Sequence, residues 1–213
     1  MARYDVKDGK TSSNLTINRY DSMYVSAGGT AEKTEVREGG IMHVSYGGTA
    51  NNTRVFYYGE LYISAGGVAN NTDIVSSGAI VHVLDGGIAN STIVITDGKL
   101  LVFAGGAVNS TSVVYGGKML VYAGGVANSV TVNHGALEIE GIVNKTSVTN
   151  NGLIKVFSGG TANSTTLEKN GDLFVYSGGT ANKITVSAGG SFVVSSGGLV
   201  TSTTVKSGGI MTL

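Results

Sequence analysis

The stretch Gly28–Tyr46 reads GGTAEKTEVREGGIMHVSY, and variants of it recur along the whole chain. The next copy, from Gly47, reads GGTANNTRVFYYGELYISA. Later copies begin at Gly66, Gly86, Gly105, Gly124, Glu140, Gly159, Gly178 and Gly197. The step from Gly66 to Gly86 is one residue longer than the usual step, and the step from Gly124 to Glu140 is three residues shorter. A degenerate first copy, Gly9–Ala27, makes eleven units. A fixed period of about 20 residues predicts a solenoid, in which each unit touches only its neighbours.

Each unit carries a regular apolar pattern when its positions are counted from the first glycine. Position 4 is small and apolar, position 7 is mostly Thr, position 9 is β-branched or Leu, and positions 15 and 17 are apolar. The spacing of two within the pairs 7/9 and 15/17 indicates strands with one buried face. We therefore predict two strands of about four residues per unit, joined by Gly-rich turns. The fold class is all-β, a single-stranded parallel β-helix of about eleven coils with about 19 residues each.

Position 5 is asparagine in most units. Stacked coils would place these side chains above one another, where amides can hydrogen-bond along the rod. The predicted structural ladder consists of Asn51, Asn70, Asn90, Asn109, Asn128, Asn144, Asn163 and Asn182.

The whole chain, residues 1–213, is expected to form one β-helix domain. Residues 1–27 would form an N-terminal cap and a degenerate first coil, and residues 28–213 the regular coils. The sequence Gly209–Leu213 stops inside the last unit without a cap, so we expect the natural chain to continue. The extra residue of unit four is assigned to a bulge or longer corner near Val81–Val83. Unit seven, Gly124–Ile139, is three residues short and is expected to be a locally narrowed coil.

Composition excludes several classes of protein. The 34 glycines do not fall at every third residue, so collagen is excluded, and the 41% of apolar residues at fixed positions argue against disorder. Fourteen basic and fourteen acidic residues cancel, which predicts no nucleic-acid partner. The absence of cysteine fits a secreted bacterial surface protein. No apolar run is long enough to span a membrane, and the N-terminus does not read as a signal peptide.

No catalytic or metal site is predicted. His43, His82 and His134 lie in different units and are not expected to stack, and no carboxylates have ligand spacing. The acidic residues are scattered, whereas polysaccharide-cleaving β-helices need clustered carboxylates. We therefore expect no enzyme activity and no cofactor.

Aromatic residues at outward positions 16 and 18 form the best candidate contact face. An apolar stripe along a rod is a plausible adhesive surface, although aromatic residues also favour strand surfaces in general. This predicted contact face consists of Tyr24, Tyr62, Phe103, Tyr122, Phe157, Phe174 and Tyr176.

The repeated phrase resembles a known family. It is clearest at Gly159–Val186, GGTANSTTLEKNGDLFVYSGGTANKITV, which is similar to the passenger repeats of AIDA-type autotransporter adhesins. The resemblance implies a right-handed β-helix stalk, exported to the bacterial surface and active in self-association or adhesion. Some members carry heptose on serine, placed by dedicated protein O-glycosyltransferases. The outward serines at position 6 are the corresponding candidates for O-glycosylation: Ser91, Ser110, Ser129, Ser164 and Ser202.

The function predicted from these observations is an adhesive passenger segment at the extracellular surface of a bacterial outer membrane. Its expected partner is itself, through weak lateral association, or a receptor or glycan on a host or bacterial surface. Two alternatives stay open: a glycan-binding or glycosylated surface rod, and a segment of a phage-type fibre. A fibre would be trimeric, and its mass in solution would show this.

Overall fold

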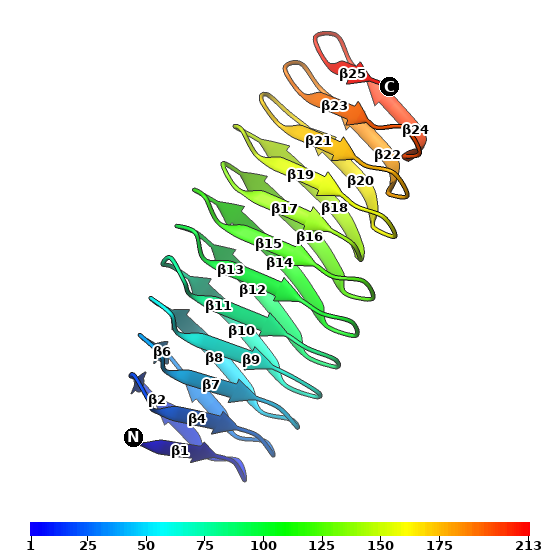
Figure 1. Cartoon of the computed structure of the whole chain (residues 1–213). Helices are drawn as coiled ribbons and strands as arrows, with labels where there is room; N and C mark the ends of the chain where they lie inside the picture. Colours follow the sequence, from blue (N-terminus) through cyan, green and yellow to red (C-terminus); the bar gives the residue numbers. More distant parts are fainter.

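The computed structural model describes all 213 residues and shows one rod of stacked coils (Figure 1). The chain forms 25 strands and no helix, so no helix is available to cross a membrane. The strands lie in two sheets, and each strand pairs in parallel with the equivalent strand of the next coil. The predicted β-solenoid of about eleven turns is confirmed.

The first sheet holds twelve short strands, one for each coil and one that precedes the first repeat. Its order is β1 (Arg3–Val6), β4 (Ser22–Val25), β7 (Ile41–Val44), β9 (Glu60–Ile63), β11 (Ile80–Val83), β13 (Lys99–Val102), β15 (Lys118–Val121), β17 (Ala136–Ile139), β19 (Leu153–Val156), β21 (Asp172–Val175), β23 (Ser191–Val194) and β25 (Ile210–Thr212).

The second sheet holds longer strands, which cover positions 3 to 9 of each unit. Its order is β2 (Thr11–Ser13), β5 (Thr30–Glu32), β8 (Thr49–Val55), β10 (Val68–Ile74), β12 (Ile88–Val94), β14 (Ala107–Val114), β16 (Val126–Asn133), β18 (Ile142–Thr149), β20 (Thr161–Leu167), β22 (Thr180–Val186) and β24 (Leu199–Val205). In the first two coils this strand is interrupted, and β3 (Thr16–Ile17) and β6 (Glu35–Val36) continue it.

The core runs along the axis of the rod between the two sheets. Forty-three buried apolar residues form one continuous cluster, with the same positions stacked from coil to coil. Val25, Val44 and Ile63 lie above one another in the first sheet, and all three are fully buried. Because burial of one such side chain contributes about 1.5–3 kcal/mol, the core supplies the main force that holds the coils together.

The strand of the second sheet is longer than predicted, because it continues through a bend at position 6. Asn52 and Ser110 occupy this position with φ values of 56° and 58°, and the equivalent residues of the other coils are also left-handed. The bend breaks the alternation of a flat strand, so that positions 4, 7 and 9 all point inward and position 6 points out. Each coil therefore consists of three straight segments where the sequence predicted two.

The two adjacent glycines at the corner are each required for a different reason. Gly47, at position 1, has a φ of 80°, a conformation that other residues rarely adopt. Gly48, at position 2, has ordinary φ, but a Cβ atom there would lie 2.1 Å from the carbonyl oxygen of Val25 in the preceding coil. The close approach of successive coils at this corner thus excludes any side chain.

The extra residue of unit four lies in a corner, not within a strand. β11 pairs with β9 without interruption, from Ile80 opposite Glu60 to Val83 opposite Ile63. The additional residue instead enlarges the corner around Ser76–Gly78. The prediction near Val81–Val83 was therefore misplaced, because an insertion within β11 would have turned its buried residues outward. The longer corner also places the buried Ala79 where other coils have glycine.

The shortened unit seven keeps both of its strands. β16 and β17 pair in full with their neighbours on both sides. The missing residues come from the corners: His134–Gly135 and Glu140–Gly141 replace the longer turns of other coils. The predicted narrowing is confined to these corners.

Candidate contact face

Six rings from six successive coils stack in one column on the outer side of the first sheet. The centroid distances are 4.8 Å for Tyr24–His43, 5.1 Å for His43–Tyr62, 4.4 Å for Tyr62–His82, 6.1 Å for His82–Phe103 and 4.9 Å for Phe103–Tyr122. All five pairs are within 20° of parallel. We call Tyr24, His43, Tyr62, His82, Phe103 and Tyr122 the ring column.

The ring column contains two of the three histidines, which stack on aromatic rings and not on each other. His43 and His82 lie two coils apart on the same side of the rod, with Tyr62 between them. They join aromatic residues that would otherwise be separated by a coil. The sequence did not show this alignment for His82. Unit four has one extra residue, so His82 falls at position 17 when counted from Gly66, although it pairs with Tyr62 at position 16.

The rest of the predicted contact face lies apart from the ring column. Phe157 and Tyr176 form a second stacked pair at 5.3 Å, and no ring stacks on Phe174. Between the two groups, coil seven carries Glu138, which forms an ion pair with Lys155 at 3.7 Å. The predicted contact face is therefore divided into two groups of rings, which are separated by the Glu138–Lys155 ion pair.

A carboxylate is held against the middle of the ring column. The Tyr62 hydroxyl donates a hydrogen bond to Glu60 Oε2, and His82 Nε2 lies 3.3 Å from the same oxygen. The hydrogen bond to Glu60 raises the pKa of Tyr62 to about 12. Burial lowers the pKa values of His43 and His82 below 6.5, although Glu60 acts in the opposite direction. Both imidazoles are therefore neutral at neutral pH.

The most exposed aromatic residues were not part of the predicted contact face. They lie at corners, where the coils turn, and each is at least 62% exposed: Tyr20, Tyr46, Tyr57, Tyr58 and Tyr115. A sequence signal that could have identified three of them, Tyr46, Tyr58 and Tyr115, is their place directly before a corner glycine. Four arginines lie over rings of the first coils, for example Arg54 over Phe56 at 4.8 Å and Arg3 over Tyr24 of the ring column at 4.2 Å.

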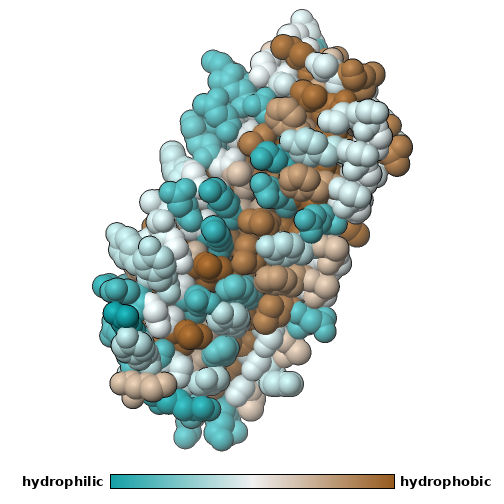
Figure 2. Space-filling model, viewed as in Figure 1, coloured by the Kyte–Doolittle hydropathy of each residue, from teal (hydrophilic) through white to brown (hydrophobic).

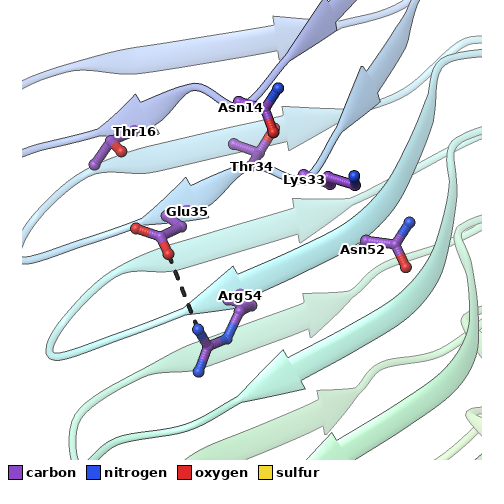
Figure 3. Close-up of a pocket in the computed structure, with 7 residues that line it drawn as sticks. All are labelled: Asn14, Thr16, Lys33, Thr34, Glu35, Asn52 and Arg54. Atoms are coloured by element: carbon purple, nitrogen blue, oxygen red, sulfur yellow. Dashed lines mark ion pairs between the residues drawn. The ribbon is translucent and has the colours of Figure 1, made fainter.

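A polar pocket of about 410 Å³ opens at the second sheet, where the strands of the first coils are interrupted (Figure 3). Glu35 and Arg54 point toward each other across it at 4.0 Å, and Glu35 also binds Arg37 at 2.6 Å. No apolar side chain lines the pocket. The only acidic side chain in the pocket is thus engaged by two arginines.

The five candidate serines all lie at the outward bend of the second sheet. Each is exposed and has a φ between 56° and 61°: Ser91, Ser110, Ser129, Ser164 and Ser202. Their hydroxyl groups are accessible from solvent along one edge of the rod. No group of three His, Cys, Asp or Glu side chains is arranged to hold a metal ion.

Comparisons with known proteins agree on the family. Residues 155–209 match the family model described as "adhesin of bacterial autotransporter system, probable stalk". The chain is also similar to the crystal structure of a TibA fragment that was hyper-glycosylated in a reaction catalysed by TibC. The two share 31% identity over 99% of this chain and 92% of that one, with a TM-score of 0.66. No curated protein matches the sequence. With its repeat and fold, this similarity shows that the chain belongs to the AIDA-type family of bacterial autotransporter adhesins, as a β-solenoid passenger segment.

Proposed function

We propose that this segment acts at the bacterial surface and associates side by side with copies of itself through the ring column and the Phe157–Tyr176 pair. The observation that carries the proposal is the ring column, which presents ring edges in six successive coils. Figure 2 shows that hydrophobic side chains gather mainly on the middle and upper, C-terminal part of this side of the rod, with hydrophilic ones between them.

The shape and charge of the rod favour this mode of association. Its formal net charge is zero, so long-range repulsion between copies is weak. A face that repeats in every coil allows many weak contacts to add along the length of two aligned rods. No catalytic step is required, which fits a family described as a structural stalk.

The test displays the segment on the surface of cells and measures how fast the cells settle. Replacing Phe103, Tyr122 and Tyr176 with Ser is expected to slow settling, while circular dichroism shows an intact rod. A matched control replaces Tyr20, Tyr46 and Tyr58 with Ser, which removes three more exposed rings from the corners. Equal effects of the two triple variants, or unchanged settling in the first, would show that the ring column is not the contact.

A second proposed property is O-glycosylation of the five serines at the bend. Their exposure supports it, and so does the glycosylation of the similar TibA fragment by TibC. Co-expression of this chain with TibC is expected to add mass in whole sugar units. Replacement of all five serines with Ala should remove that added mass, and persistence of the full increase would place the acceptors elsewhere.

A further inference from the structure

A shallow groove on the outer side of the first sheet crosses coils four to eight. Its volume is about 480 Å³, within the range of roughly 300–1,000 Å³ that is usual for small-molecule sites. The outer side chains of Leu101, Leu120 and Tyr122 give it an apolar lining, and Lys99 and Lys118 stand beside them.

The groove exists because coil seven is irregular. Ala136 pairs with Lys118 in the strand ladder, and its methyl group leaves a space that a longer side chain fills in the neighbouring coils. Leu153 occupies the same position in the next coil. The shortened corner of coil seven also provides no ring to stack on Tyr122.

Lys99 and Lys118 are directly opposite each other in adjacent strands. Strands in a sheet are about 4.8 Å apart, and like charges placed opposite each other destabilise the pairing. Neither lysine has an acidic partner, because Glu138, the carboxylate in the groove, binds Lys155. An arrangement that opposes folding without a compensating contact is a sign of function.

We propose that this groove binds an acidic sugar, a pyranose whose carboxylate lies between Lys99 and Lys118 and whose apolar ring face packs on Leu101 and Leu120. The two ammonium groups complement one carboxylate, and the aliphatic and aromatic lining complements the C–H face of the ring. An acidic polypeptide is less suitable, because the backbone groups of β13 and β15 are paired on both sides and offer no strand edge for pairing. The groove shares Tyr122 with the ring column, whereas Lys99 and Lys118 lie outside it, so substitution of the two lysines tests the sugar site without removing a ring.

The test titrates the chain, dilute and isotope-labelled, with 3′-sialyllactose and with glucuronate while the methyl NMR signals of Leu101 and Leu120 are followed. We expect saturable shifts with both acidic sugars, weaker binding at high salt, and no saturation with lactose. Replacing Lys99 and Lys118 with Gln should weaken binding by about tenfold or more, as expected for loss of a charged hydrogen bond. Lys169→Gln, which removes one lysine charge at an exposed corner, should leave binding unchanged.

A second variant tests whether binding needs the space in the groove as well as the two lysine charges. Ala136→Leu introduces the residue that coil eight already carries at this position, so the coil should fold, and binding should be lost although both lysines remain. Absence of saturable shifts with both acidic sugars would overturn the proposal, and so would equal binding of lactose. Equally tight binding of a hexaglutamate peptide would reassign the groove to acidic polypeptides, and equal binding of sulfate would reduce it to a general anion site.

Discussion

The Asn51 amide donates a hydrogen bond from Nδ2 to the Glu32 carboxylate at 2.5 Å, and this bond ends a ladder of side-chain amides. Each asparagine donates to the Oδ1 atom of the one in the preceding coil at 2.9–3.0 Å. The Thr201 hydroxyl donates to Asn182 at the other end. All donors point the same way, so Glu32 supplies the acceptor at the end where the chain of amides needs one.

Interruption of this ladder in the middle is expected to destabilise the rod. Asn128→Ala removes a bond of 3.0 Å to Asn109 and one of 2.9 Å from Asn144. At about 0.5–1.5 kcal/mol for each bond, the free energy of unfolding should fall by about 1–3 kcal/mol. Thr131→Ala, at an exposed position of the same strand, is the control in chemical denaturation. A loss that does not exceed that of Thr131→Ala would mean that the ladder adds no stability.

Introducing an aspartate at each of two adjacent residues can test which of them points into the core and which points out. Val113 is fully buried in β14, whereas Ser112 beside it is half-buried on the outer side. Val113→Asp would bury an unpaired charge and should lower stability by several kcal/mol, about 3 or more. Ser112→Asp should change the melting temperature little. Similar losses in both variants would contradict the assignment.

Substitution of a buried threonine at position 7 by valine is expected to have the opposite effect, a gain in stability. The Thr111 hydroxyl is buried without a hydrogen-bond partner, and the residue that pairs with it in the next coil is Val130. Thr111→Val replaces that hydroxyl with a methyl group of the same shape, so unfolding should require up to about 1 kcal/mol more. Thr111→Ser keeps the hydroxyl and loses a methyl group, and it should cost about 0.8 kcal/mol. A less stable Thr111→Val variant would show that the hydroxyl has a partner.

The histidines of the ring column should make stability depend on pH. Because burial lowers the pKa values of His43 and His82 in the folded state, the unfolded chain binds protons more readily. The folded state is therefore favoured above the unfolded pKa of about 6.5, and this contribution is lost as the pH falls below it. We expect the melting temperature to fall from pH 7.5 to pH 5.5.

The double variant His43→Phe/His82→Phe keeps two rings in the column and removes both titrating groups. Its melting temperature should fall less over the same pH interval than that of the unchanged chain. A control variant, His134→Phe, removes the exposed histidine at the corner of coil seven. If the control flattens the pH dependence as much as the double variant, the ring column is not its source.

The repeat by itself determined the type of fold and the inward side of each coil. A short fixed period, with apolar pairs two apart, leaves few ways to bury Val113 and Met119 other than by stacking coils. The asparagine positions also followed from the period alone. Each of these features depends on burial repeated within one unit, and the sequence shows such repetition directly.

The tertiary structure decided which side chains of different coils become neighbours. The corner that holds the extra residue near Ser77 and the stacking of His82 on Tyr62 both depend on how the coils align across the longer step of unit four. The groove beside Lys118 arises in the same way, from a small Ala136 and a shortened corner one coil away. Alignment across an irregular step is set by core packing and by the strand pairing of both sheets, and no single unit contains that information.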